Sequence, residues 1–389
     1  MKAQRRTIAT YFFSLAIIGL LSAWYFNFLA VLGREDYLAD GFTSNVDWVY
    51  SLDLLIGGIA GMTLIVIEGR RLGMKHLWAY IALGFVTAFA FVFPLFLGMR
   101  ELRLRRIDLA GGRIDTYEFD KHRVDVWVPP SVSDTTPVLV MHDGKNVFFS
   151  EHSTFGATWG ILDALRDGRI RGEKKPLIIA VWGLSDATRI NELGPEDLYV
   201  EHPEIFDMLP PELMPATRTP MSNAYQSLVA TRIVPELAAQ YGIALHPDRT
   251  AIAGSSMGGL ASLYGLAKHP DVYGTALCYS THWPFGFEIT VDKLTKLVPP
   301  AGHHHIWTDT GTIELDAIYP PFHAAAAEKL AQRGYRYDVD FIHAIYPNTG
   351  HSETWWAGRV EHPINWWLDP NEPKSTPDKP TTWVGKPQD

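Results

Sequence analysis

Residues 254–258 read Gly-Ser-Ser-Met-Gly, a G-x-S-x-G pattern in which Ser256 holds the middle position. An apolar run at 250–253 predicts a strand directly before the pattern, and the stretch at 258–268 predicts a helix directly after it. This arrangement is typical of a nucleophile elbow, a strained turn that exposes the serine oxygen and leaves little room beside it. The sequence therefore predicts Ser256 as a nucleophile. The alternative interpretation is an ordinary Gly/Ser-rich turn.

A serine hydroxyl needs a base to become a good nucleophile, and His351 is the histidine best placed to supply one. Elbow-type hydrolases have the chain order serine, acid, histidine, and His351 lies in a loop after the last predicted strand. The rivals are the consecutive histidines at 303–305, which fall inside a predicted strand. Neighbouring side chains of a strand point to opposite faces, so these three cannot converge on one ion, and no metal site is predicted.

The acid that orients the histidine should lie just after the predicted strand at 302–308, where several carboxylates compete. They are Asp309 at the strand end, Glu314 three residues beyond the loop glycine, and Asp316. The sequence-based preference is Glu314, with Asp316 as the second choice. The expected role of this acid is to hold His351 in the correct tautomer and to stabilise the imidazolium.

Acyl transfer also needs two backbone N–H groups that stabilise the oxyanion. Met257, the residue after the nucleophile, is expected to supply one of them. The segment His-Asp-Gly-Lys-Asn at 142–146 follows a predicted strand, and Lys145 or Gly144 is expected to supply the other. A simple turn is the alternative interpretation of this segment.

These residues lie where short apolar runs alternate with helical stretches. Strands are predicted at 124–128, 137–141, 176–181, 250–253, 302–308 and 337–344, and helices at 159–166, 224–241, 258–268 and 321–333. This alternation indicates an α/β fold with a mostly parallel sheet, built as one domain from 107–370. The proline-containing connection at 196–222 is expected to be a partly ordered cap that sets substrate choice. The tail at 371–389 is expected to be disordered.

The residues before this domain, 1–106, have a different composition. Runs at 11–33 and 77–99 carry no charged residue, and the run at 48–67 is interrupted only by Asp53. A helix needs about 20 apolar residues to cross a bilayer, so three transmembrane helices are predicted. The first run could instead be a signal peptide, but it is too long for one and lacks a small-residue cleavage site.

The positions of Lys and Arg predict the orientation. Lys2, Arg5 and Arg6 precede the first run, and Arg70, Arg71 and Lys75 follow the second, whereas the loop at 33–47 has only Arg34. The N-terminus is therefore predicted inside, and three crossings place the domain at 107–370 outside the cytoplasm. The arginines after the third run oppose this orientation: Arg100, Arg103, Arg105 and Arg106.

Composition excludes some classes of protein. The net charge is -9 at pH 7, which argues against a nucleic-acid-binding protein. The single cysteine, Cys278, excludes an internal disulfide bond and a cysteine-cluster zinc site, and it lies outside every predicted catalytic position. No cofactor motif is present, so none is predicted.

The domain at 107–370 resembles the esterase family of α/β-hydrolases, which includes enterochelin esterases, esterase D, feruloyl esterases and mycolyltransferases. The matching segments are VMHDGKNVF at 140–148, RINEL at 189–193, AGSSMGG at 253–259, DTGTIE at 309–314 and GHSETWW at 350–356. The resemblance implies serine hydrolysis of carboxylic esters, or acyl transfer, without a metal. It carries the family's serine and histidine to Ser256 and His351, and the acid, less securely, to Glu314.

The segment at about 8–106 is similar to a family of small three-helix bacterial membrane proteins with no assigned function. Together the two parts predict a multi-pass protein of the bacterial inner membrane, in contact with lipid, that carries a serine esterase acting on a small-molecule, lipid or sugar ester. An acyltransferase that uses a sugar or lipid hydroxyl in place of water is the first alternative. A non-catalytic binding protein on a hydrolase scaffold is the second. The oligomeric state and the ester itself are left open.

Overall fold

The computed structural model describes residues 2–208 and 217–369, and the chain divides into two compact units that meet in sequence at Leu109 and Ala110. Each unit is described by itself. The predicted tail at 371–389 and the middle of the predicted cap, 209–216, lie outside the described residues.

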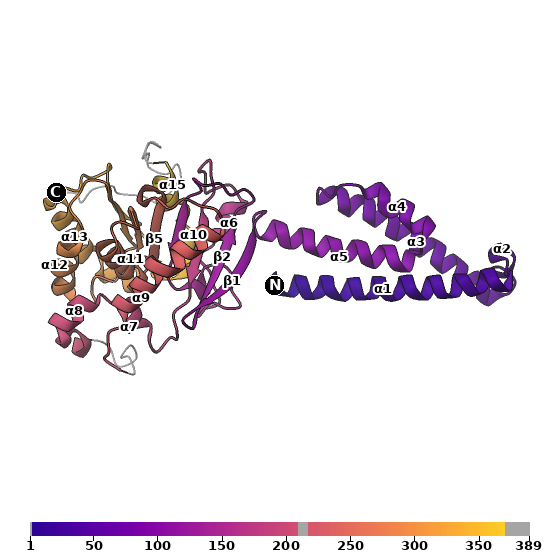
Figure 1. The fold of residues 1–389 in the computed structure, drawn as a ribbon, viewed down its shortest axis with the longest axis horizontal. Helices are drawn as coiled ribbons and strands as arrows, with labels where there is room; N and C mark the ends of the chain where they lie inside the picture. The colour runs from indigo at the N-terminus through magenta and orange to yellow at the C-terminus, as the bar shows by residue number, and fades with distance from the viewer. Residues whose placement is uncertain (1, 209–216, 370–389) are drawn as a thin grey trace. The chain divides into compact units, whose positions relative to one another are not determined.

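The first unit is helical (Figure 1). Its helices are α1 (Lys2–Gly33), α2 (Tyr37–Asp40), α3 (Asn45–Arg71), α4 (Leu77–Val86) and α5 (Phe89–Asp108). Among the described residues, two helices are long and apolar enough to cross a membrane, Arg5–Gly33 within α1 and Asn45–Arg71, which is α3. Three such helices were expected from the sequence.

The third predicted span, 77–99, is divided between α4 and α5. The helix breaks at Thr87, whose backbone N–H and hydroxyl both donate to the carbonyl of Leu83, at 2.8 and 2.7 Å. Ala88 then has an extended backbone, with φ -167° and ψ 148°, so the chain cannot continue as one helix. The side-chain bond to the carbonyl four residues earlier is a known cause of helix distortion.

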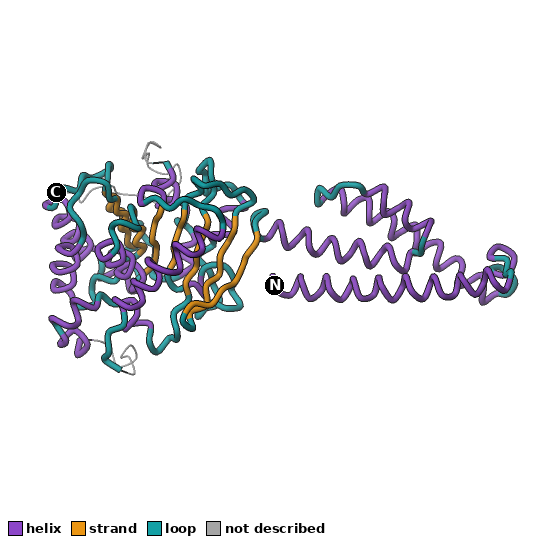
Figure 2. Tube along the Cα trace, viewed as in Figure 1, coloured by secondary structure: helices purple, strands orange, loops and turns teal. Residues whose placement is uncertain are grey.

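The second unit is built on one sheet with the strand order β1-β2-β4-β3-β5-β6-β7-β8. Its strands are β1 (Arg113–Phe119), β2 (His122–Val128), β3 (Val138–Met141), β4 (Leu177–Val181), β5 (Thr250–Ser255), β6 (Thr275–Tyr279), β7 (His305–Thr310) and β8 (Phe341–Ile345). β2 pairs antiparallel with β1 and β4, and every other neighbouring pair is parallel. The predicted mostly parallel α/β sheet is confirmed, and Figure 2 shows its strands side by side with helices packed around them.

The helices of this unit are α6 (Ile161–Arg166), α7 (Arg189–Leu193), α8 (Glu196–Glu201), α9 (Ser222–Leu228), α10 (Val234–Gln240), α11 (Met257–Lys268), α12 (Phe287–Leu297), α13 (Pro320–Gln332), α14 (Glu353–Ala357) and α15 (Glu361–Leu368). Each of the four helical stretches predicted in this unit contains helix, and the helices α7, α8, α12, α14 and α15 were not predicted. The predicted helix at 224–241 is interrupted by a π-helical turn, Val229–Ile233, which ends two residues before Pro235, a residue with no N–H to donate.

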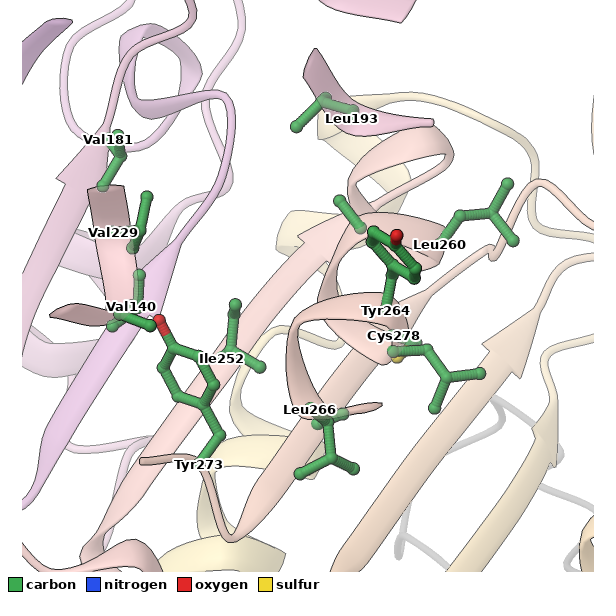
Figure 3. Packing of buried hydrophobic residues seen from close by; sticks show 14 of the residues in the cluster. Val140, Val181, Leu193, Val229, Ile252, Leu260, Tyr264, Leu266, Tyr273 and Cys278 are labelled. Carbon is green, nitrogen blue, oxygen red and sulfur yellow. The ribbon is translucent and has the colours of Figure 1, made fainter. Parts of the chain in front are cut away.

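The sheet is held by a buried core in which α11 packs against β5 and β6 (Figure 3). Ile252 and Cys278 of the sheet and Leu260 of α11 are fully buried. At about 25 cal/mol per Å² of apolar area removed from water, such side chains hold the start of α11 firmly against the carboxyl end of β5. The residue between that strand and that helix is Ser256.

The first part of the predicted cap is a packed element rather than an open loop. Residues of α8 and the following 3-10 turn (Pro203–Met208) belong to the main core, with Leu198 and Phe206 each 2% exposed and Ile205 0% exposed. Tyr199 packs against Phe206 with ring centroids 4.8 Å apart.

Candidate active site

Ser256 stands alone between β5 and α11 with a backbone conformation that side chains rarely adopt, φ 57° and ψ -122°. The two glycines of the motif make this turn possible. A Cβ added to Gly254 would lie 2.3 Å from the carbonyl oxygen of Gly258, so any side chain there would separate the strand from the helix. Strained backbone of this kind costs on the order of 1–3 kcal/mol and clusters at functional sites. The geometry is that of a nucleophile elbow.

The segment His142–Asn146 lies against the elbow. A Cβ on Gly258 would be 3.4 Å from Oδ2 of Asp143, and one on Gly144 would be 2.6 Å from the carbonyl of Ala180 in β4. Within residues 2–208 and 217–369, no acceptor takes the backbone N–H of Met257, Gly144 or Lys145. All three groups named from the sequence as oxyanion donors therefore remain available for a ligand oxygen.

Asp143 is held by a two-bond ion pair with Arg189 at the start of α7. Nε and Nη2 of Arg189 each donate to one carboxylate oxygen at 2.7 Å. Burial alone would raise the pKa of Asp143, but the nearby guanidinium outweighs it, and the pKa lies below its usual value. Arg189 thereby fixes the loop that carries Gly144 and Lys145.

His351 is paired with Asp316, the second choice from the sequence. Nδ1 of His351 lies 2.6 Å from Oδ1 of Asp316, which is fully buried. The other carboxylate oxygen accepts from the hydroxyl of Ser280 at 2.6 Å and from the N–H of Gly311 at 2.7 Å. Burial raises the pKa of Asp316, but the hydrogen bonds from His351, Ser280 and Gly311 outweigh it, so the pKa is lowered and the carboxylate stays ionised at neutral pH.

Here the structure differs from the sequence-based preference for Glu314. Oε2 of Glu314 accepts from the backbone N–H of His351 at 3.0 Å, and Oε1 accepts from the indole of Trp355 at 3.3 Å. Glu314 thus contacts the main chain of the histidine rather than its ring. Its backbone has φ 56°, and its carboxylate fits only because Gly350 has no side chain, since a Cβ there would lie 2.1 Å from Oε2.

Behind Asp316 lies a buried polar network that the sequence did not indicate. Arg359, 1% exposed, donates through Nη2 to Ser280 at 2.8 Å and to the fully buried Asp309 at 2.9 Å. The indole of Trp356 also donates to the Ser280 hydroxyl, at 3.0 Å. With two donors on its oxygen, that hydroxyl must direct its own proton to Asp316. The network therefore orients the carboxylate that orients His351.

Tyr319 links the elbow to the histidine. Its hydroxyl bonds Nδ1 of His282, whose backbone N–H donates to the carbonyl of Ser256 at 3.1 Å, and its ring centroid lies 5.4 Å from that of His351. Burial, followed by the charges of His351 and Arg189, lowers the pKa of His282 to about 3, so His282 is neutral at physiological pH. Burial raises the pKa of Tyr319, which therefore keeps its proton.

Ser280 and His282 could have been found from one missed element. They follow β6, a five-residue strand that the sequence analysis did not predict. The carboxyl ends of neighbouring parallel strands lie at the same edge of a sheet, and β6 pairs with β5, which ends at the elbow. Predicting β6 would have placed both residues beside Ser256.

The three consecutive histidines lie away from this arrangement. Only His305 belongs to β7, and His304 bonds the carbonyl of Pro270. Among the described residues, no group of three or more His, Cys, Asp or Glu side chains is placed to hold a metal ion.

A buried carboxyl beside the site gives a pH-dependent prediction. Glu353 is 4% exposed, and Asn146 donates to it at 3.0 Å. Burial raises the pKa of Glu353 and outweighs a backbone hydrogen bond that lowers it; Asp143 raises the pKa further, against the smaller effects of Arg189 and His351. A raised native pKa means that ionisation costs stability above that pKa, and that this cost vanishes below the unfolded value of about 4.3.

We therefore expect Glu353→Gln, which keeps an oxygen for Asn146, to be more stable than the wild type at pH 7 and equal to it near pH 3.5. Denaturant unfolding of the full chain at the two pH values measures this difference. If Glu353→Gln instead lost stability relative to wild type as the pH rose from 3.5 to 7, Glu353 would not be buried in its ionised form at pH 7.

Two protein-family models match the chain. Residues 210–361 match the family model described as "Putative esterase". The C-terminal part of the chain therefore matches an esterase family over these residues. Residues 11–102 match the model described as "Protein of unknown function DUF2834". Both resemblances predicted from the sequence are confirmed, and the esterase domain on its mostly parallel sheet supports a carboxylic ester hydrolase.

The chain is also similar to several solved structures. An enterobactin and salmochelin hydrolase is 18% identical, with a TM-score of 0.48, covering 66% of this chain and 96% of that one. The enterobactin esterase of Shigella flexneri is 15% identical, with a TM-score of 0.48, over 67% of this chain and 59% of that one. A ferulic acid esterase is 14% identical, with a TM-score of 0.43, over 66% of this chain and 97% of that one. No curated protein matches the sequence.

Proposed function

We propose that the chain is a membrane-anchored serine esterase whose nucleophile is Ser256. The observation that carries the proposal is the strained elbow at Ser256, joined through His282 and Tyr319 to a histidine whose Nδ1 is held by a buried carboxylate. Nδ1 of His351 carries its proton toward Asp316, so Nε2 is left as the basic nitrogen. We assign the orienting role to Asp316 and not to Glu314.

The proposed reaction has two halves. Ser256 Oγ attacks the ester carbonyl while His351 takes its proton, and the oxyanion is stabilised by the N–H of Met257 together with that of Gly144 or Lys145. The tetrahedral species expels the alcohol, which receives the proton from His351, and leaves an acyl-enzyme on Ser256. Water, deprotonated by His351, then attacks the acyl-enzyme and releases the acid. The substrate class is a small-molecule carboxylic ester.

The proposed anchor is the first unit, with α1 and α3 as membrane-crossing helices. Their apolar side chains are exposed along the helices, as in Ile18 at 62%, Ile56 at 65% and Ile67 at 62%. In water such surfaces would be costly, whereas in hydrocarbon they are solvated. The bacterial inner membrane is the location that the sequence pattern predicts. The three crossings predicted from the sequence would put the esterase domain outside the cytoplasm, whereas the structure has two helices of crossing length among the described residues.

The test is labelling with a fluorophosphonate, which reacts covalently with activated serines. The probe should label the full chain in membranes and should fail to label Ser256→Ala. Ser255→Ala is the matched control, because Ser255 is the neighbouring hydroxyl, 3% exposed at the end of β5, and this variant should still be labelled. Equal labelling of wild type and Ser256→Ala would refute the proposal.

A further inference from the structure

The contacts between α1 and α5 fix how these helices run. A Cβ on Gly19 would meet the carbonyl oxygen of Ala90 at 2.2 Å, and one on Gly98 would meet the ring of Phe13 at 2.5 Å. Arg5 bonds Glu101 at 3.0 Å and Asp108 at 2.8 Å. As the residue number rises along α5, its partner's number falls along α1. The helices are antiparallel, and α5 starts level with Gly19 and ends level with the N-terminus.

The contacts of α3 give the direction of α4. A Cβ on Gly69 would meet Leu77 at 2.3 Å, and one on Gly84 would meet Met62 at 2.3 Å. α4 therefore runs antiparallel to α3, from the level of the C-terminal end of α3 to the level of Met62 in α3.

The start of α5 lies at that same level, because a Cβ on Gly61 would meet Phe89 at 2.2 Å. Farther along, Arg100 pairs with Glu68 at 2.8 Å. α5 thus returns past α3 toward the end from which α4 began (Figure 1).

The reversal between Val86 and Phe89 lies near the middle of both long helices. Beyond Gly19, α1 continues to Gly33, and beyond Gly61, α3 extends back to Asn45, which is about 20 Å more in each case. The ten residues of α4 span about 15 Å, and so do the apolar residues of α5 up to Met99. A bilayer core is about 30 Å thick, so α4 and the apolar part of α5 are each long enough to cross one leaflet but too short to cross both.

The tip of this hairpin suits hydrocarbon. Phe85 is 86% exposed and Val86 is 80% exposed. The N–H of Thr87 donates to Leu83, and the carbonyl of Ala88 accepts from the N–H groups of Phe91 and Val92, so these backbone groups of the interruption do not need water.

The opposite end of the same unit is charged and tied together. Glu68 of α3 pairs with Arg71 and Arg100, and Glu101 of α5 pairs with Arg100 and with Arg5 of α1. Glu68 and Glu101 are buried among these arginines. The N-terminus of α1, the C-terminus of α3 and the C-terminus of α5 are therefore at one level. Charged networks of this kind belong at the membrane surface rather than in its core.

We infer that α4 and α5 form a re-entrant hairpin inserted in a single leaflet, so that the chain enters the esterase domain on the same membrane face as its own N-terminus. The inference rests on the proposed membrane anchoring. It replaces the three predicted crossings by two and moves the esterase domain to the cytoplasmic face. All Lys and Arg residues flanking the helices then lie on that face except Arg34, and the arginines after α5 no longer oppose the orientation.

Single-cysteine labelling tests the inference on the full chain. The wild-type Cys278 is fully buried and serves as the silent background. Three exposed positions report three regions: Glu35→Cys in the loop after α1, Lys75→Cys before α4, and Glu173→Cys in the esterase domain. A membrane-impermeant maleimide is added to bacterial spheroplasts before and after permeabilisation.

The expected result is labelling of Glu35→Cys in intact spheroplasts and of Lys75→Cys and Glu173→Cys only after permeabilisation. Labelling of Glu173→Cys in intact spheroplasts with Lys75→Cys protected would restore three crossings and overturn the inference. Release of the chain by an alkaline wash of the membranes would overturn the anchor as well. Failure of the esterase proposal is read separately, as loss of fluorophosphonate labelling in a chain that keeps the expected thiol pattern.

Discussion

Asp316→Asn should lower kcat/KM for a chromogenic ester by about three to four orders of magnitude, as removal of the orienting charge does in the Ser-His-Asp template. Asp316 accepts from Nδ1 of His351 at 2.6 Å, and the bonds from Ser280 and Gly311 fix its other oxygen. An asparagine held in the same place can present its NH₂ group to His351, which favours the wrong tautomer and removes the charge that stabilises the imidazolium. The ester-binding residues are untouched, so the loss should appear in kcat more than in KM.

Glu314→Gln is the matched control, since it removes a carboxylate from the same loop. Its oxygen can still accept from the backbone N–H of His351, so we expect activity within about tenfold of wild type, the scale of one neutral hydrogen bond. Steady-state rates of the two variants separate the two acids, with protection of the buried Cys278 thiol from a thiol probe as the check on folding. If Glu314→Gln lost more activity than Asp316→Asn, the assignment would return to Glu314.

The difficulty of choosing this acid from sequence has a physical origin. Glu314 and Asp316 follow the same predicted strand at nearly the same distance, and spacing alone cannot tell which carboxylate turns toward a ring 35 residues later. The choice is made by partners far along the chain, Ser280 and Gly350, which respectively bind Asp316 and make room for Glu314. By contrast, the elbow is local: Gly254 and Gly258 constrain a turn of five residues, and the pattern reveals it.

The strands and helices show the same contrast between features set by a local sequence pattern and features set by contacts far along the chain. The predicted strands at 137–141, 176–181 and 250–253 correspond to β3, β4 and β5, because buried parallel strands have continuous apolar runs. β1 is a polar edge strand and β6 follows a glycine in a short run, so neither gave a clear pattern. In the first unit the break after Val86 has no glycine or proline at its centre, and the apolar run at 77–99 looks continuous. Composition predicts which residues prefer lipid but not where a helix reverses.

Arg359→Met should lower the free energy of unfolding of the esterase domain by about 3–5 kcal/mol, the usual cost of removing one partner from a buried ion pair. Arg359 and Asp309 are both buried, with Nη2 and Oδ1 2.9 Å apart. Methionine fills similar space but leaves Asp309, among the residues that the structure describes, with only the N–H of Ser280 and the indole of Trp307 as donors. A charge that stays buried without its counter-ion destabilises more than the lost hydrogen bonds alone.

Cys278 provides the measurement within the full chain. It is the single cysteine, it lies in β6 and is fully buried, and burial raises the pKa of its thiol, so it reacts with a thiol probe only when the domain opens. Pulsed labelling across a urea series should give an earlier midpoint for Arg359→Met. The double variant Arg359→Met/Asp309→Asn removes the stranded charge and should recover much of the loss. Two results would contradict this explanation: a single variant whose free energy of unfolding is within about 1 kcal/mol of wild type, or a double variant less stable than the single one. In either case the buried charge of Asp309 would not be the reason that Arg359 is needed. The contribution of Arg359 would then be the hydrogen bond that orients Ser280 toward Asp316.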